Sequence, residues 1–186
     1  MKRVKSLVTT LMEVAANPVG FAMDETMSGT HRFVEAGQPG GDLPMSFTLN
    51  WGTKDLRTFL DPRSKETFCT ADAKGHVSIA GLVEGADCTG TLELRYFPEA
   101  KIRYKFSFKG KRGKKFHYVG EKINLRPWNL HRTHTTCYGT LYATRTGQEV
   151  SKSITYFRFS MLPAFLMSFR LFGPGLGWLK TAESAA

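Results

Sequence analysis

Two runs of alternating side chains, joined by a glycine-containing turn, constrain the fold of this chain more than any other feature. In residues 101–108 every second side chain is apolar, and the side chains between them are polar or charged. The apolar positions are Ile102, Tyr104, Phe106 and Phe108. Successive side chains of a β-strand point to opposite faces, so this pattern predicts a strand with one apolar and one polar face. A turn at residues 109–115 and a second alternating run at 116–122 complete a predicted β-hairpin.

Short runs of the same kind recur along most of the chain. The other expected strands cover residues 21–34, 45–51, 67–71, 76–83, 89–97, 133–145 and 150–160. Residues 54–61 are less β-like and precede Pro62, so we expect a short helical turn that plugs an opening or crosses between strands. Roughly eight to ten short strands at close spacing are typical of an all-β barrel or sandwich. The chain lacks βαβ alternation, which argues against a parallel sheet.

We therefore predict an all-β fold, an antiparallel lipocalin-like (calycin-type) β-barrel or a strongly curved sheet. A chain of 186 residues is long enough for one sizeable core, so we expect a single domain over residues 1–186 with the barrel at 21–160. Residues 1–17 carry apolar side chains at helical spacing and predict an N-terminal amphipathic helix. Packing of that helix against the barrel is the commoner outcome, and membrane contact is the alternative.

The C-terminal segment, residues 161–180, is almost wholly apolar. Arg170 and two prolines interrupt it well short of the ~20 apolar residues that a membrane span needs. We expect this segment to cover a barrel mouth, with insertion into a membrane interface as the alternative.

The chain is strongly basic, with 26 Lys and Arg against 16 Asp and Glu and a formal net charge of +10. This balance favours contact with anionic surfaces. Five cations gather in the predicted hairpin turn and form a candidate anionic-surface site: Lys109, Lys111, Arg112, Lys114 and Lys115. A solvated hairpin is the alternative. Nucleic acid is not expected as a partner, because the aromatic and basic side chains of the hairpin lie on opposite faces.

Cysteine usage indicates a reducing compartment. Cys69, Cys88 and Cys137 are widely spaced and odd in number, and no CxxC pair is present. This pattern predicts neither a zinc knuckle nor a disulfide framework. The basic N-terminus resembles the start of a signal peptide, but Glu13 interrupts its short apolar run. We expect a cytoplasmic protein, with peripheral membrane association as the alternative.

The densest group of reactive side chains lies in residues 128–137 and contains His131, His134 and Cys137. In an extended chain a spacing of three places successive members on opposite faces, so we predict no metal site. Such a site would also need a distant ligand, and His31, His76 and His117 are the other histidines. Weak catalytic candidates are Glu25, Glu121, His131 and His134. A carboxylate inside an apolar barrel would have a raised pKa and could transfer protons, whereas an ion pair or plain exposure is the alternative for Glu121 and its neighbour Lys122.

The inward positions of the predicted strands are candidates for contact with an apolar ligand. They are Phe47, Leu49, Trp51, Leu92, Leu94, Tyr96, Tyr104, Phe106, Tyr118, Trp128, Tyr138 and Tyr156. Barrels of about eight strands have an interior that holds one small ligand or is filled by side chains. The same residues would therefore serve equally well as solid core.

Short motifs spread over residues 21–145 resemble a domain that accompanies bacterial cholesterol-oxidase-like members of the glucose–methanol–choline oxidoreductase family. The matching pieces are Glu25-Thr-Met-Ser-Gly29, Asp55-Leu-Arg-Thr-Phe-Leu-Asp-Pro62, Gly75-His-Val77, Gly90-Thr-Leu-Glu-Leu94, Ile102-Arg-Tyr104, Val119-Gly-Glu-Lys122 and Thr135-Thr-Cys-Tyr-Gly-Thr-Leu141. The resemblance implies an association with sterol or other lipid metabolism and a lipid-metabolising oxidoreductase as a partner. The flavin-binding glycine motif of those oxidoreductases is absent, so the resemblance implies no redox activity, and we expect no cofactor.

These observations together predict a carrier or accessory protein that binds a hydrophobic ligand, such as a fatty acyl or sterol molecule, inside a β-barrel. Two alternatives remain open. One is a lipid-modifying enzyme of the isomerase, cyclase or hydratase type on the same barrel, and the other is a peripheral membrane module that uses the basic hairpin.

Overall fold

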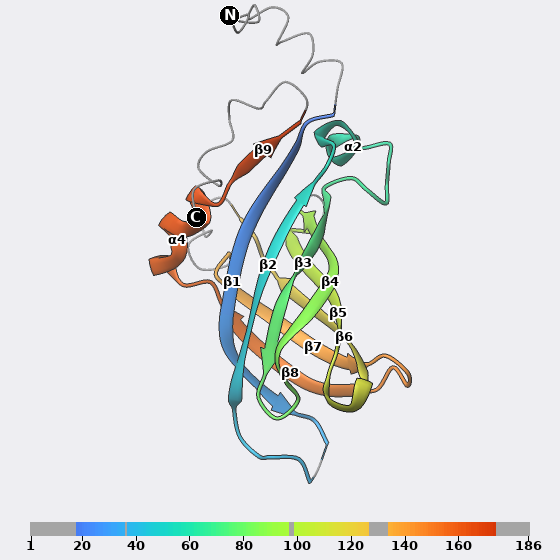
Figure 1. The fold of residues 1–186 in the computed structure, drawn as a ribbon, viewed down its shortest axis with the longest axis vertical. Coiled ribbons are helices and arrows are strands. Elements are labelled where there is room, and N and C mark those ends of the chain that lie inside the picture. The colour runs from blue at the N-terminus through green and yellow to red at the C-terminus, as the bar shows by residue number, and fades with distance from the viewer. Residues whose placement is uncertain (1–17, 36, 97–98, 127–133, 174–186) are drawn as a thin grey trace, which may run out of the picture.

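The protein folds as an antiparallel β-barrel, as the computed structural model shows for residues 18–35, 37–96, 99–126 and 134–173 (Figure 1). Eight strands form the barrel: β1 (Gly20–Phe33), β2 (Leu43–Thr53), β3 (Thr70–Ile79), β4 (Val83–Arg95), β5 (Lys101–Lys109), β6 (Lys115–Lys122), β7 (Thr136–Ala143) and β8 (Glu149–Tyr156). Each strand pairs antiparallel with the next one in sequence, and β8 pairs with β1 to close the barrel. The prediction of an all-β antiparallel barrel is confirmed. The N-terminal helix expected at 1–17 lies outside the described residues.

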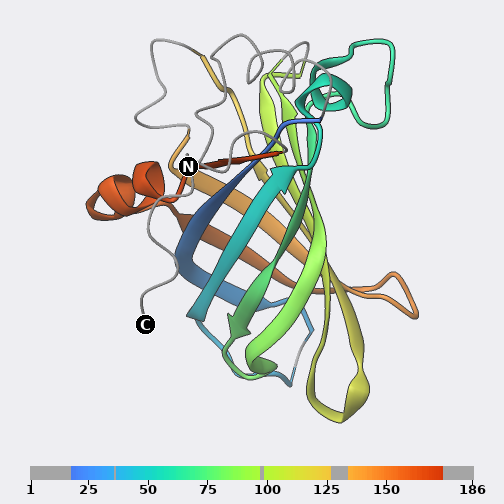
Figure 2. The ribbon, with the colours of Figure 1, turned by 45° about the horizontal axis from the view of Figure 1, so that its top comes forward.

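The two ends of the barrel differ. The upper end, where β1 begins, carries α2 (Leu56–Leu60), and the lower end carries the β1–β2, β3–β4, β5–β6 and β7–β8 turns (Figures 1 and 2). The helical turn expected near residues 54–61 is α2, which begins after Asp55, whose side chain accepts a hydrogen bond from the Arg57 backbone N–H. Its one buried side chain, Phe59, meets the Phe21 ring edge-on at 5.4 Å. The helix therefore caps part of the upper rim.

The C-terminal part of the described chain lies beside the start of β1. It comprises the short 3₁₀ turn η2 (Phe159–Met161), α4 (Leu162–Met167) and β9 (Arg170–Phe172). Strand β9 pairs with Gly20–Ala22 of β1. Arg170 forms an ion pair with Asp24 at 3.0 Å, and the hydroxyl of Ser168 accepts a hydrogen bond from the Asp24 backbone N–H at 2.9 Å. These contacts fix the segment to the upper half of β1.

The alternation that predicted the hairpin of β5 and β6 is confirmed. The side chains of Ile102, Tyr104, Phe106 and Phe108 are all buried. Phe47, Leu49 and Trp51 of β2 are also buried and alternate with more exposed neighbours, as expected.

Two residues predicted to face the interior face outward instead. Tyr138 is 50% exposed and Tyr156 is 47% exposed. The inward positions of β7 and β8 are taken by smaller neighbours, Cys137 and Gly139 on β7 and a run of hydroxyl side chains on β8. The tyrosines suggested that β7 and β8 have an aromatic inner face. The limited space inside the barrel favours the opposite alternation, in which the smaller side chains point inward and the tyrosines point outward.

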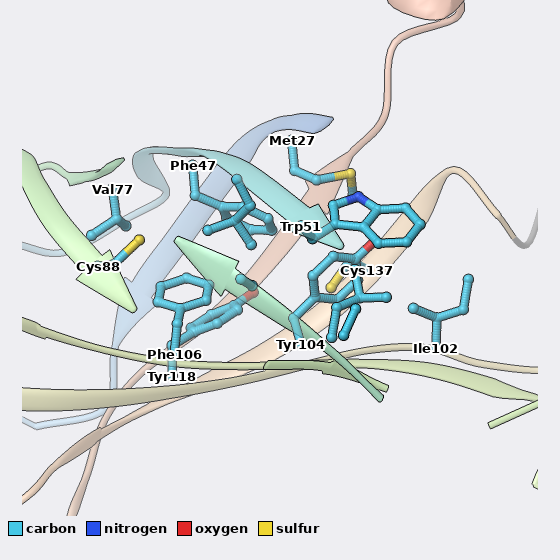
Figure 3. Close-up of a cluster of buried hydrophobic side chains, with 14 of the residues drawn as sticks. Met27, Phe47, Trp51, Val77, Cys88, Ile102, Tyr104, Phe106, Tyr118 and Cys137 are labelled. Atoms are coloured by element: carbon cyan, nitrogen blue, oxygen red, sulfur yellow. The ribbon is translucent and has the colours of Figure 1, made fainter. Parts of the chain in front are cut away.

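The middle of the barrel is filled by side chains (Figure 3). The Phe47 ring lies 5.7 Å from Tyr104, 5.3 Å from Phe106 and 5.8 Å from Tyr118, between ring centroids. Phe106 and Tyr118 stack at 4.7 Å. Each of these four rings is at most 1% exposed. The aromatic side chains of the midsection are therefore solid core.

Glycines on β6 and β7 create the space that the Tyr118 ring occupies. Gly120 and Gly139 are register partners on adjacent strands. A Cβ atom at Gly139 would overlap the hydroxyl and ring of Tyr118, and one at Gly120 would come within 2.7 Å of the same ring and 2.8 Å of the Cys137 sulfur. The Tyr118 hydroxyl also lies 3.1 Å from Ser153 Oγ. The large ring thus depends on the absence of side chains beneath it.

Replacing Gly139 with alanine is expected to lower the free energy of unfolding by about 1–3 kcal/mol, since overfilling a packed interior displaces neighbouring side chains. Urea denaturation measures this change. The double variant Gly139→Ala with Tyr118→Leu should lose less stability than the sum of the two single variants, because the smaller side chain leaves room for the added methyl. Additive losses would contradict the proposed dependence of Tyr118 on Gly139.

Candidate functional site

A buried ion pair lies inside the upper half of the barrel. Lys122 Nζ of β6 donates to Glu25 Oε1 of β1 at 2.7 Å, and the Tyr104 hydroxyl of β5 lies 3.1 and 3.0 Å from the two Glu25 oxygens. Glu25 is 5% exposed and Lys122 4%. The Lys122 ammonium also lies 5.4 Å from the Tyr104 ring centroid and 6.0 Å from that of Phe157. Strands that are far apart in sequence are thus joined by charge across the interior.

A second polar contact lies close to this ion pair and joins Tyr96 to His134. The Tyr96 hydroxyl and His134 Nε2 are 3.2 Å apart. Burial lowers the pKa of His134 and the Lys122 charge lowers it further, whereas the Glu25 charge opposes the shift. Burial, together with the Glu25 charge, raises the pKa of Tyr96 to about 12. At neutral pH this contact therefore joins two uncharged groups.

The structure brings only part of the predicted catalytic set together. Glu25 and His134 both belong to the upper interior, Glu121 lies on the outer face, and His131 is outside the described residues. Both Glu25 oxygens already accept hydrogen bonds from Tyr104, and Oε1 also accepts one from Lys122, which restrains the carboxylate in place. Burial raises the pKa of the Cys137 thiol to about 12, so this cysteine is not a thiolate at neutral pH. The cluster has the character of a structural polar core.

The histidines and cysteines that the structure describes do not assemble into a metal centre. Among the described residues no group of three or more His, Cys, Asp or Glu side chains could hold a metal ion. His31 is buried near the lower end, with Nε2 3.0 Å from the Ala80 carbonyl oxygen. His76 pairs with Asp87 on the outer surface at 3.0 Å, and His117 Nδ1 lies 3.1 Å from the Ser107 hydroxyl. Each of the three thus has a separate local partner.

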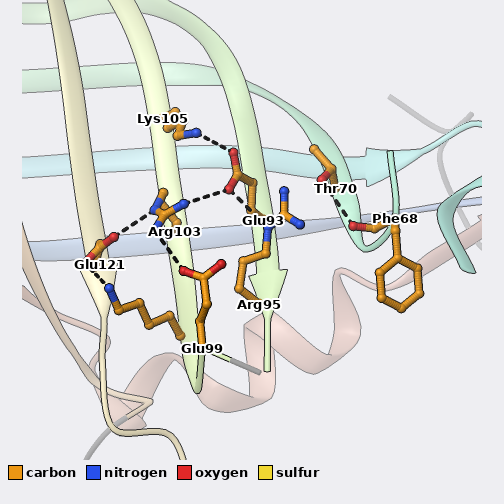
Figure 4. A network of polar contacts seen from close by, with 9 residues as sticks. Phe68, Thr70, Glu93, Arg95, Glu99, Arg103, Lys105 and Glu121 are labelled. Carbon is orange, nitrogen blue, oxygen red and sulfur yellow. Dashed lines mark hydrogen bonds and ion pairs between the residues drawn. The ribbon is translucent and has the colours of Figure 1, made fainter. Parts of the chain in front are cut away.

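The outer face of β4, β5 and β6 carries a network of charges (Figure 4). Glu93 contacts Lys105 at 2.6 Å and Arg103 at 3.3 Å, and Arg103 in turn contacts Glu121 at 2.7 Å. Lys101 lies 3.2 Å from Glu121. Burial would raise the pKa of Glu93, but hydrogen bonds and positive charges from Lys105 and Arg95 outweigh it and lower that pKa. Lys101, Arg103 and Lys105 of β5 are therefore neutralised by carboxylates.

The cations at the tip of the hairpin are placed differently. Lys109, Lys111, Arg112, Lys114 and Lys115, the five residues of the predicted anionic-surface site, are all exposed. The tip contains the 3₁₀ turn η1 (Lys111–Gly113), within which Arg112 adopts a left-handed backbone conformation with φ 58°. This turn brings Arg112 and Lys114 to the edge of a cavity at the lower end of the barrel.

That cavity has a volume of about 910 Å³ and lies between the β5–β6 turn, the β7–β8 turn and the end of β1. Its apolar lining residues are Phe33, Leu82, Phe116, Ala143 and Val150. Its charged lining residues are the four cations Arg112, Lys114, Lys115 and Arg145 and the single carboxylate Glu35. We call this cavity the lower mouth. It joins an apolar wall to a rim with a net positive charge.

Only part of the lining of the lower mouth could be predicted from the sequence. The basic turn predicted three of its four cations but not Arg145. Phe33, Leu82 and Val150 come from three other strand ends or turns and gave no joint signal. The Gln148 side-chain amide donates to Glu35 Oε1 at 2.6 Å and so links the β7–β8 turn to the chain after β1. Closure of the barrel, which pairs β8 with β1, is what brings these segments together.

The predicted ligand-contacting residues do not line this cavity. Phe47, Leu49, Leu92, Tyr104, Phe106 and Tyr118 are buried in the core, as is Trp51, whose Nε1 donor has no partner among the described residues. Leu94 and Tyr96 are partly buried against the same core. Trp128 lies outside the described residues.

Comparison with known proteins adds no relationship: no family model, no curated protein and no solved structure matches the chain. In the part of the chain that the structure describes, no helix is both long and apolar enough to cross a membrane.

Proposed function

We propose that the protein binds a hydrophobic molecule with an anionic group, such as a fatty acid or an acidic sterol derivative, at the lower mouth. The observation that carries this proposal is a cavity of about 910 Å³ with apolar walls and four cations on its rim. Ligand pockets in proteins have volumes of roughly 300–1,000 Å³ and are mostly apolar with a few polar groups that orient the ligand. The lower mouth fits this description in size and in lining.

The two parts of the lining suit the two parts of such a ligand. Contact with Phe33, Leu82 and Phe116 would remove the apolar part from water, which favours binding by about 25 cal/mol per Å² of apolar surface buried. A carboxylate or phosphate would then remain at the rim beside Arg112, Lys114 and Arg145. Charged groups on a solvated rim contribute little each but fix the orientation of the ligand.

The filled midsection moves the proposed ligand from the centre of the barrel to its lower end. The proposal includes a lipocalin-like relationship for the barrel, supported by its eight antiparallel strands in next-neighbour order. The motif resemblance to the accessory domain of cholesterol-oxidase-like enzymes suggests an oxidoreductase of lipid metabolism as the protein that supplies or receives the ligand.

Acid–base catalysis is the weaker proposal. It is favoured by the proximity of Glu25 and His134, but Lys122 and Tyr104 already engage the Glu25 carboxylate. The lower mouth also lies at the opposite end of the barrel from that cluster, because its Lys115 begins β6 whereas Lys122 ends it. A carrier function needs only the cavity.

Titration with a fluorescent fatty acid such as cis-parinaric acid tests the proposal. We expect saturable binding to the native protein and an affinity at least tenfold lower for the double variant Lys114→Glu, Lys115→Glu, because two rim charges are reversed. A matched control, Lys65→Glu with Lys74→Glu, makes the same change in net charge at exposed positions away from the mouth. Equal losses in the two variants, or no binding to the native protein, would refute the proposed site.

A further inference from the structure

The segment from Phe157 to Gly173 exposes an unusual number of apolar side chains. Met167 is 86% exposed, Leu166 61%, Phe159 58% and Phe169 48%. Met161, Leu162 and Phe172 add further exposed apolar surface, at 39%, 38% and 38%. Monomeric proteins rarely leave such residues together in water, and apolar patches of this kind mark sites of contact with a membrane or another macromolecule.

The geometry of α4 explains why these side chains are exposed. Phe165 is the helix residue that packs inward, with its ring edge-on to Phe157 at 5.4 Å. The other α4 residues, Leu162, Pro163, Ala164, Leu166 and Met167, are all exposed. A helix that is apolar on all sides is normally buried in a core or in lipid. Figures 1 and 2 show α4 projecting from the side of the barrel beside β1.

The charged residues within the sequence of this segment are all of one sign. The sequence contains no Asp or Glu from Val150 to Ala182, whereas Lys152, Arg158, Arg170 and Lys180 lie within that range. Arg158 is exposed immediately before η2, and Arg170 follows α4. Arg170 is paired with Asp24 of β1, so Arg158 is the exposed cation beside these apolar side chains. Apolar side chains next to such a cation are typical of segments that lie in the interface of an anionic membrane.

We propose that α4 and its flanks, residues 157–173, dock the protein onto the surface of a lipid bilayer that contains anionic lipids. Leu166 and Met167, with Phe159 and Phe169 beside them, enter the interface, and Arg158 meets the headgroups. The segment lies at the upper half of β1, so the docked protein keeps its lower mouth free. The inference therefore does not depend on the proposed ligand site.

Charge favours a bilayer over a second copy of the chain as the occupant of this surface. Each copy carries a formal net charge of +10, so two copies brought together through this surface repel each other, whereas an anionic membrane attracts each of them. The hairpin tip, with its exposed lysines, is the other basic candidate for membrane contact. It lies at the lower end of the barrel, whereas α4 projects from the side beside β1, so the two surfaces can be tested separately (Figure 2).

Co-sedimentation of the full chain with vesicles tests this inference. We expect binding to phosphatidylcholine vesicles that contain phosphatidylglycerol, and weaker binding to phosphatidylcholine alone. The double variant Leu166→Ser, Met167→Ser should have an affinity for these vesicles that is at least about tenfold lower. Burial of each of the two side chains in the bilayer strengthens binding by roughly a factor of ten. Leu60→Ser, which removes an apolar side chain of 58% exposure on α2, should bind like the native protein.

Three results would overturn the inference. The first is no sedimentation with either kind of vesicle. The second is binding that is lost in the hairpin variant Lys109→Gln, Lys111→Gln but retained in the Leu166, Met167 variant, which would assign membrane contact to the hairpin tip. The third is a native dimer, seen by sedimentation velocity, that the Leu166, Met167 variant dissociates. Binding of cis-parinaric acid by the Leu166, Met167 variant is expected to be unchanged, so failure here is distinguishable from failure of the ligand site.

Discussion

Replacement of Lys122 by methionine is expected to lower the free energy of unfolding by about 3–5 kcal/mol at neutral pH, because it leaves the Glu25 carboxylate buried without its cation. Tyr104 would still donate to that carboxylate, but a single neutral donor does not replace an ammonium group 2.7 Å away. Urea denaturation followed by circular dichroism measures the loss.

The double variant Glu25→Gln, Lys122→Met should recover most of this loss, since it buries no unpaired charge. Lys101→Met is the matched surface control. It breaks the partly exposed pair with Glu121, and we expect it to cost less than about 1 kcal/mol. A loss for Lys122→Met as small as that of the control would show that the pair is solvated and that the upper interior is open to water.

Replacement of Phe47 by alanine is expected to cost about 3–5 kcal/mol, the usual range when a buried aromatic ring is removed from a packed core. Phe47 is 1% exposed and contacts the rings of Tyr104, Phe106 and Tyr118. The variant should also contain an apolar cavity in the centre of the barrel, and such cavities bind small apolar molecules. Benzene should therefore raise the melting temperature of the variant and leave that of the native protein unchanged.

Leu60→Ala is the control for this variant, because the Leu60 side chain is 58% exposed and its removal creates no cavity. If benzene stabilised the native protein as strongly as the Phe47 variant, the barrel would already be hollow at its centre. The ligand would then belong inside the barrel rather than at the lower mouth.

Local alternation predicted the antiparallel β architecture, although the two strands expected at 67–71 and 76–83 are mostly one strand, β3 (Thr70–Ile79). In β5 the period of two was unbroken, so the hairpin and the buried face of this strand followed from the sequence. The α2 turn followed from a weak β pattern before Pro62. Strand count and the absence of βαβ alternation then predicted an antiparallel barrel.

Features that depend on contacts across the barrel could not be predicted in this way. Glu25 and Lys122 are 97 positions apart, and nothing local to either residue indicated the pair. Tyr138 and Tyr156 face outward because small residues beside them make room for Tyr118, a constraint that acts between strands. Whether an aromatic interior is hollow or filled depends on the fit of side chains in three dimensions, which alternation does not encode.

The lower mouth shows the same limit at the level of function. Three of its four cations, Arg112, Lys114 and Lys115, were predicted as part of an anionic-surface site because they are neighbours in the sequence, whereas Arg145 was not predicted. Its apolar wall was missed because Phe33, Leu82 and Val150 become neighbours only when the barrel closes. The sequence therefore predicted most of the cations of the proposed ligand site but not its apolar wall.

The most direct test of ligand binding at the lower mouth is a titration of the isotope-labelled protein with oleate, followed by amide chemical-shift changes in NMR spectra. The proposal predicts saturable changes concentrated in residues 33–35, 110–116 and 143–150, with the core positions Tyr104 and Tyr118 affected least. Changes centred on Phe47, Tyr104 and Tyr118 would place the ligand inside the barrel, and an unchanged spectrum at saturating oleate would contradict lipid binding itself.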